Sequence, residues 1–182
     1  MNRFIITEPS SCIGCHTCEI ACTLAHPIVD GSTQMLSPAN FKPRLKLLKT
    51  QNITSTVQCR HCEDAPCVNV CPTNALIYSE DTVQLLDELC IGCKTCVIAC
   101  PFGAMNMEVK PIKRSVINGL SANSTQVTAH KCDLCVDREK GPACMEVCPT
   151  KAIHLVASDS SDDMLRQMHK QTIFKQLTGA AR

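Results

Sequence analysis

The sequence predicts an α+β fold in which a small unit of short hairpins and short helices is used twice. Three observations predict it. Large aromatic side chains are scarce, with 4 Phe, 1 Tyr and no Trp in 182 residues. The 16 cysteines stand in four groups of four, and the first two groups resemble the last two. Because so few large side chains can fill a core, the interior must be organised around the cysteines.

The four cysteine groups follow one another along the chain and use every cysteine: Cys12, Cys15, Cys18, Cys22; Cys59, Cys62, Cys67, Cys71; Cys90, Cys93, Cys96, Cys100; and Cys132, Cys135, Cys144, Cys148. The first and third groups have the spacing C-x2-C-x2-C-x3-C. That spacing is typical of bacterial ferredoxins, in which three thiolates hold one [4Fe–4S] cube and the fourth reaches a neighbouring cube. Four groups therefore predict four [4Fe–4S] clusters.

The second and fourth groups, C-x2-C-x4-C-x3-C and C-x2-C-x8-C-x3-C, would each also suit zinc if they stood alone. They share a chain with two ferredoxin runs, and groups two, three and four all end in Cys-Pro. The segment from Cys12 to Cys22 matches that from Cys90 to Cys100 at most positions, and group two resembles group four. The pattern indicates a duplicated two-motif unit and favours iron over zinc.

Short strands are expected around the cysteine groups, over Phe4–Thr7, Arg44–Leu48, Ile53–Val57, Ala75–Tyr78, Val83–Leu86, Ala104–Val109 and Ala152–Val156. The strands on either side of residues 79–82 predict a hairpin. A short helix is expected between the last two cysteines of each group, ended by the proline that follows. Residues 23–52 and 110–130 carry prolines and glycines and are interpreted as long loops.

The tail, residues 159–182, differs from the rest because it has no cysteine. Ser160 or Ser161 can cap a helix whose first turn carries Asp162 and Asp163. Two interpretations of this helix stay open. It packs on its own domain, or it docks on another subunit or a second copy of the chain.

Other classes of function find little support. The formal charge is +1 with neutral thiols, but four oxidised cubes with four thiolates each would bring it to about −7, which argues against nucleic-acid binding. There is no glycine-rich nucleotide loop, haem attachment motif or paired catalytic side chains, and the six histidines show no ligand spacing. The chain is therefore expected to be non-catalytic.

No apolar run is long enough to cross a membrane, and no secretory or twin-arginine leader precedes the first group. Thiolate–metal chemistry suits a reducing compartment, so a cytoplasmic protein is expected, either soluble or attached to a membrane through a complex. Lys94, Lys131 and Arg60 lie inside or beside the cysteine loops. They could raise reduction potentials, or they could be ordinary surface charges.

The chain resembles the four-cluster ferredoxin-like subunits of molybdopterin oxidoreductases, and more closely the small electron-transfer subunits of formate hydrogenlyase, formate dehydrogenase-H and related hydrogenase complexes. The resemblance covers about residues 1–157. It is carried by the segments Met1–Ile6, Cys12–Glu19, His61–Cys67, Lys131–Cys135 and Gly141–Cys144.

The resemblance implies that group one shares ligands with group four, and group two with group three. Each cube then takes three cysteines from one group and the last cysteine of its partner. The four sets are Cys12, Cys15, Cys18 and Cys148 (set A); Cys132, Cys135, Cys144 and Cys22 (set B); Cys59, Cys62, Cys67 and Cys100 (set C); and Cys90, Cys93, Cys96 and Cys71 (set D).

Two pseudo-symmetric lobes would result within a domain over residues 1–158, lobe one from about 1–52 with 110–158 and lobe two from about 53–109. The resemblance implies an electron-transfer subunit between a molybdenum- or tungsten-containing formate dehydrogenase or CO2 reductase and a hydrogenase or other redox partner. A free polyferredoxin carrier, or a helper in the maturation of such enzymes, is the alternative.

Overall fold

The structure, a computed structural model, describes residues 2–27, 36–38, 40–115 and 121–157. The fold is α+β, as the sequence predicts. The tail helix expected over residues 159–182 lies outside the described residues.

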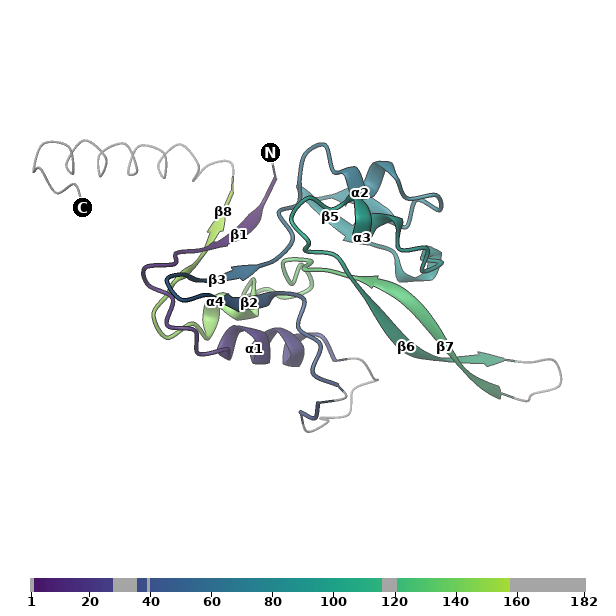
Figure 1. Ribbon diagram of the computed structural model, residues 1–182. Coiled ribbons are helices and arrows are strands. Elements are labelled where there is room, and N and C mark those ends of the chain that lie inside the picture. Colours follow the sequence, from purple (N-terminus) through teal and green to yellow (C-terminus); the bar gives the residue numbers. More distant parts are fainter. Residues whose placement is uncertain (1, 28–35, 39, 116–120, 158–182) are drawn as a thin grey trace, which may run out of the picture.

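The eight strands among the described residues form four antiparallel pairs, and Figure 1 shows how these pairs are arranged. The pairs are β1 (Phe4–Thr7) with β8 (Ile153–Val156), β2 (Lys46–Lys49) with β3 (Thr54–Val57), β4 (Leu76–Ser79) with β5 (Thr82–Leu85), and β6 (Asn106–Ser115) with β7 (Ser121–His130). The β4–β5 hairpin confirms the turn expected at residues 79–82. The β1–β8 pair joins the two ends of the cysteine-containing region, so the first and last cysteine groups lie in one part of the molecule.

The helices are short and lie at the cysteine groups: α1 (Thr17–Ala25), α2 (Pro66–Asn69), α3 (Thr95–Ala99) and α4 (Ala143–Glu146), with a 3-10 turn at Asp87–Leu89. Helix α3 ends directly before Cys100, as expected for a helix followed by Pro101. Helix α1 continues to Ala25 because Thr23 stands where the other groups have proline.

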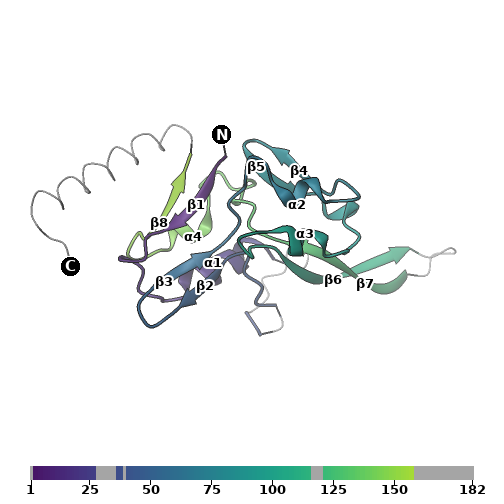
Figure 2. The same cartoon turned by 45° about the horizontal axis from the view of Figure 1, so that its top comes forward.

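Two groups of elements lie side by side (Figure 2). One contains β1, β8, β2, β3, α1 and α4, and helix α1 packs against α4. The other contains β4, β5, α2 and α3, and helix α2 packs against α3. Strand β3 pairs with β2, so this hairpin spans the expected lobe boundary near residue 53.

Residues 110–115 and 121–130, within the predicted loop over 110–130, are strand, and here the prediction from sequence was wrong. Strands β6 and β7 form a long ribbon that extends away from the body (Figure 1). Pro111 suggested a break, but it is opposite Thr125 in a two-stranded ribbon. A proline is tolerated there because half of the N–H groups in each strand face away from the partner. Val109 opposite Val127 is a cross-strand pair of β-branched residues that favours this structure.

The cores contain cysteine side chains among a few aliphatic ones, which confirms that the interior is organised around the cysteines. Ile5, Leu45, Leu134 and Ile153 pack with Cys18, Cys22, Cys59, Cys132 and Cys144 in the first core. Leu76, Val83 and Met105 pack with Cys67 and Cys96 in the second. Cys100 contacts both cores, so the two groups of elements meet at a cysteine.

Candidate iron–sulfur centres

All sixteen cysteines lie in the described part of the chain, and all are free thiols there. Eight of them are buried, and two, Cys15 and Cys93, are exposed. These two occupy equivalent places in groups one and three. No two cysteines among the described residues form a disulfide.

The loops of groups one and three have the same backbone conformation. Gly14 and Gly92 both have φ of +70°, and His16 and Lys94, which precede helices α1 and α3, have φ of 61° and 66°. Left-handed residues at these positions curl the chain tightly. The curl turns backbone N–H groups inward, as in other anion-binding loops. Three cysteine side chains of each group can then face one point.

Several N–H and O–H groups donate hydrogen bonds to the cysteine sulfurs. The Thr17 hydroxyl donates to Cys15 Sγ at 3.2 Å, and the Thr95 hydroxyl donates to Cys93 Sγ at 3.3 Å. These hydroxyls are the largest cause of the lowered pKa of both thiols. Further donors come from backbone N–H groups: Arg44 to Cys22 at 3.2 Å, His61 to Cys59 at 3.4 Å, Ala129 to Cys90 at 3.4 Å and Ala152 to Cys148 at 3.3 Å. Donors aimed at sulfur stabilise thiolates, which are the form that binds metal.

Two cavities are lined by four cysteines each. One contains Cys12, Cys15, Cys18 and Cys148, beside Gly14 and Ile153. The other contains Cys71, Cys90, Cys93 and Cys96, beside Leu76 and Met107. In each, three cysteines come from one group and the fourth is the last cysteine of another group. These eight residues have the composition of sets A and D.

The other eight cysteines are grouped by which thiols raise one another's pKa. Burial raises the pKa of the Cys144 thiol, and the charges of Cys132, Cys22 and Cys135 raise it further. Burial likewise raises the pKa of Cys67 to about 11, with further contributions from Cys59, Cys100 and Cys62. Apart from Cys18, a member of set A that also raises the pKa of Cys144, the cysteines that act on these two thiols belong to sets B and C.

The donor sets fit [4Fe–4S] clusters. Four thiolates packed together and partly buried repel one another, and burial raises the pKa of Cys132 to about 12. A cluster of iron ions between the sulfurs supplies the positive charge that removes this repulsion. Four convergent thiolates per site, with N–H donors behind several sulfurs, are the ligand chemistry that such clusters require.

His26 and Asp133 contact this site, although their spacing gave no signal in the sequence. His26 Nε2 lies 3.1 Å from Asp133 Oδ1, and Arg44 forms an ion pair with the other oxygen of Asp133. Burial opposes a charge on His26, but hydrogen bonds to Asp133 and Cys135 raise its pKa to about 11. His26, Asp133 and Cys135 lie close enough together to hold a metal ion. The carboxylate of Asp133 already binds His26 and Arg44, and it also accepts a hydrogen bond from the backbone N–H of Cys135 at 2.9 Å, so it holds the loop of the fourth group in place.

The sequence left open whether Lys131 is an ordinary surface charge. Its side chain is buried, with 3% exposed, so it is not a surface charge. Arg60 stacks over the ring of Phe4 at 5.5 Å, and Lys94 is exposed beside Cys93. Burial and the charge of Lys131 lower the pKa of His61 to about 3, so His61 is neutral and accepts a hydrogen bond from Val83 N at 2.9 Å.

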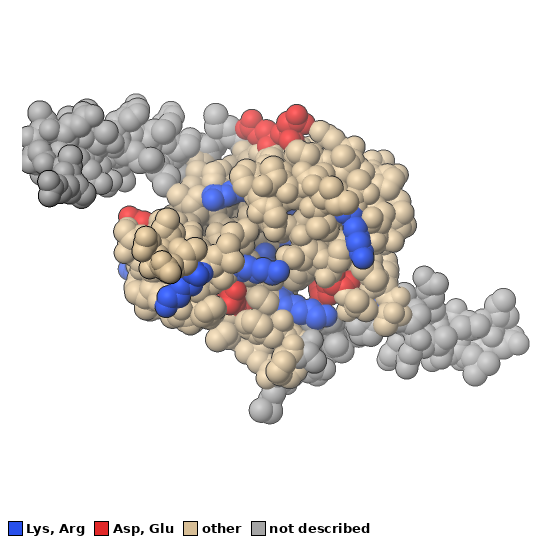
Figure 3. All heavy atoms as spheres, viewed as in Figure 1, with Lys and Arg blue, Asp and Glu red and all other residues tan. Residues whose placement is uncertain are grey.

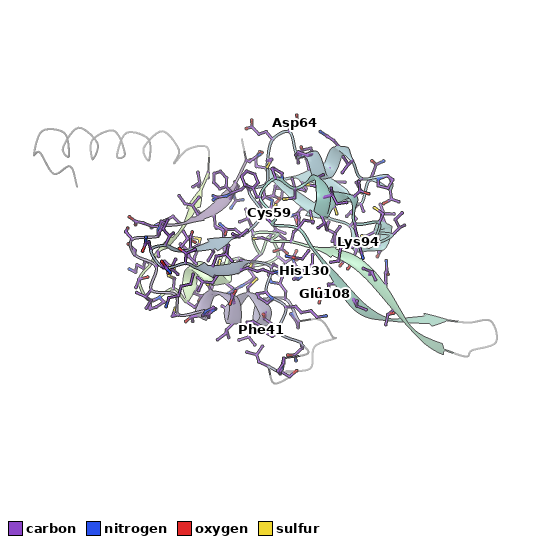
Figure 4. All side chains as sticks on the ribbon, viewed as in Figure 1. Phe41, Cys59, Asp64, Lys94, Glu108 and His130 are labelled. Carbon is purple, nitrogen blue, oxygen red and sulfur yellow. The ribbon has the colours of Figure 1, made fainter. Side chains whose placement is uncertain are left out.

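The surface carries charges of both signs. Lys and Arg side chains are scattered over the face shown in Figure 3, some beside Asp or Glu, and most of that face is uncharged. Glu108 and His130 lie close together at the base of the β6–β7 ribbon, with Cys59 near the middle of the molecule (Figure 4). Among the described residues, no helix has the length and apolar character needed to cross a bilayer.

Comparison with known proteins identifies the family. Two profiles described as 4Fe-4S dicluster domain match residues 50–158 and 11–76. The electron transport protein HydN of Escherichia coli K12 is 45% identical over 172 residues, which cover 94% of this chain and 98% of HydN. Hydrogenase-4 component A of the same organism is 38% identical over 93% of this chain and 90% of its own length.

A third relative shows this unit inside a larger protein. The putative oxidoreductase AegA of Escherichia coli K12 is 44% identical over 94% of this chain, which spans 24% of AegA. The sixteen free cysteines and these similarities agree. The chain belongs to the 4Fe-4S dicluster family of ferredoxin-like electron-transfer proteins.

Proposed function

We propose that the chain holds four [4Fe–4S] clusters in the crossed sets A to D and relays electrons along them. The observation that carries this proposal is the convergence of thiols from different groups. Cys148 lines a cavity with the first group, Cys71 lines one with the third, and the charges of Cys100 and Cys22 act on thiols of the second and fourth groups.

The sets follow one another in the order A, B, C, D. The charge of Cys18, in set A, raises the pKa of Cys144, in set B, together with nearer charges and burial. Cys100, in set C, packs against both cores. Sets C and D share the second core through Cys67 and Cys96. Neighbouring sets therefore lie close together and pack against the same side chains, as a relay requires.

The two ends of this order are the places where sulfur is exposed. Cys15 belongs to set A and Cys93 to set D, and both are exposed. Two positions before them in the loops, Ile13 and Ile91 are 63% and 66% exposed. Exposed apolar side chains beside a redox centre suit transient contact with a partner protein. Electrons would enter at one end and leave at the other.

The partners are proposed from the relatives. HydN is named as an electron transport protein and another relative as a hydrogenase component. We assign this chain to the relay between a molybdenum- or tungsten-containing formate dehydrogenase or CO2 reductase and a hydrogenase or another redox partner. It acts as a non-catalytic subunit in the cytoplasm, either soluble or attached to a membrane through its complex.

The domain arrangement follows from the same scheme. Lobe one, about residues 1–52 with 110–158, would hold sets A and B, and lobe two, about 53–109, would hold sets C and D. The tail over residues 159–182 would dock on a partner subunit or on a second copy of the chain. Deletion of residues 159–182 should therefore reduce partner binding or oligomer size while leaving the iron content unchanged.

An anaerobic pull-down of the native protein, with metal analysis of everything that is retained, tests the proposed function. About sixteen irons per chain, together with a partner that contains molybdenum or tungsten, is the expected result. Sixteen irons on a chain that retains no partner would favour a free carrier instead. Zinc in place of iron would contradict both.

A further inference from the structure

Lys131 is a buried cation at the junction between the two groups of elements. It directly follows β7 and precedes Cys132, and only 3% of its side chain is exposed. Its Nζ donates hydrogen bonds to the carbonyl oxygen of Val83, on β5, and to that of Cys132 at 2.7 Å. The first carbonyl belongs to one group of elements and the second to the other, so the side chain bridges them.

Lys131 lies beside two ligand sets at once. One of its acceptors is the carbonyl oxygen of Cys132, which belongs to set B. The other is the carbonyl oxygen of Val83, which lies in the second core together with Cys67 of set C. Sets B and C are the two inner sets of the proposed order, and the side chain of Lys131 lies between them.

A buried ammonium is costly unless negative charge lies nearby. Two carbonyl oxygens satisfy its hydrogen bonds only in part, because an ammonium has three donors. The carboxylate of Asp133 is already held by Arg44 and His26. Cys132, whose own carbonyl oxygen accepts from the ammonium, and Cys67, which lies in the same core as Val83, bring thiolates of sets B and C close to Lys131, so those sets would provide compensating charge.

We propose that Lys131 is a positioning residue whose charge stabilises an added electron on the cluster held by set B or by set C. It thereby raises the reduction potentials of the two clusters between which the electron crosses from one lobe to the other. This inference depends on the proposed function. In that transfer the cluster held by one set would lose one electron and the cluster held by the other set would gain it, and no proton would move. A fixed positive charge beside both sets favours the reduced form of each, because reduction adds one negative charge.

Four variants test the role of the charge. Lys131→Gln removes the charge and keeps an N–H donor for the carbonyls, whereas Lys131→Met removes both. Lys131→Arg keeps the charge. Lys94→Gln removes an equal charge from an exposed position in the loop of set D and serves as the matched control. The measurement is a redox titration of the anaerobically purified protein followed by EPR.

Lys131→Gln should lower the potentials of two of the four clusters, with about a tenfold loss in the equilibrium constant for reduction, or about 59 mV for a one-electron couple. Lys131→Arg should keep both potentials near those of the parent. Lys94→Gln should leave the same two clusters unchanged. Unchanged potentials in Lys131→Gln, with the clusters intact, would overturn the inference.

The two proposals fail in different ways. Absence of iron from the parent protein would contradict the proposed function before any variant is made. If Lys131→Met does not retain its clusters, Lys131→Gln still decides, because it conserves a donor to the carbonyls. A potential shift in Lys131→Arg equal to that in Lys131→Gln would show that the packing of the side chain matters and its charge does not.

Discussion

Replacing Gly92 by alanine should destabilise the protein more than replacing Gly14, although both have φ of +70°. The left-handed conformation costs any residue with a Cβ about 1–2 kcal/mol, and this cost is common to both variants. The difference lies in what the added methyl group meets. At Gly92 it would lie 2.6 Å from the backbone oxygen of Val127, whereas at Gly14 it would lie 3.2 Å from the side-chain methyl of Thr54.

The ribbon backbone at Val127 cannot move as easily as a methyl group at the end of a side chain. The extra crowding at Gly92 should therefore add about 1–3 kcal/mol, in the range of other overpacked sites. Because every 1.4 kcal/mol is about tenfold in an equilibrium or rate constant, cluster loss should be about five- to 150-fold faster than in the Gly14 variant. Gly14→Ala itself should show only the common cost.

The assay is the decay of cluster absorbance at a fixed temperature under anaerobic conditions, compared among the parent, Gly14→Ala and Gly92→Ala. A rate is the appropriate measure because cluster loss is irreversible. Equal decay of the two variants would refute the close approach of the set D loop to β7. The same result would remove the reason for placing the ribbon against that loop.

Three further changes have expected outcomes. Cys22→Ala should cost about four of sixteen irons and expose the other members of set B to alkylation, measured by mass spectrometry. Cys12, Cys15 and Cys18 should stay protected, and their alkylation instead would overturn the crossed sets. Asp133→Asn should lose the stabilisation linked to the raised pKa of His26 and the lowered pKa of Asp133. Its deficit in unfolding free energy should be largest between about pH 4 and pH 6.5. It should shrink towards pH 11 as His26 loses its proton, and below about pH 4 as Asp133 gains one, while a constant deficit would contradict the ion pair. Tyr78→Phe removes the acceptor 2.5 Å from the buried N–H of Ala65 and should cost about 1–3 kcal/mol in denaturant unfolding, whereas no change would argue against this bond.

The sequence predicts the parts of the fold that depend on local chemistry. Three cysteines spaced by three residues, with a glycine between the first two, predict a tight ligand loop, and the strands next to these loops follow from β-branched residues. Strands β1, β4, β5 and β8 begin within one residue of their predicted starts. The Cys-Pro ending similarly predicts where α3 ends.

The rest depends on contacts between distant residues. The proline at 111 and the glycine at 119 favoured a loop, because sequence shows neither the edge position of Pro111 nor its partner Thr125. The burial of Lys131 results from carbonyls on β5 and at Cys132. His26 and Asp133 meet across more than a hundred positions of sequence, and no spacing rule covers such a pair. The available signals were a histidine four residues after Cys22 and an aspartate between Cys132 and Cys135.

The central claim is that the four cysteine groups hold four [4Fe–4S] clusters for electron transfer. Iron and acid-labile sulfide analysis of the anaerobically purified chain, with EPR spin counting after reduction, tests it most directly. About sixteen irons and sixteen sulfides per chain, with spins from four reducible clusters, is the predicted result. About eight irons, or zinc at any of the four sites, would contradict it.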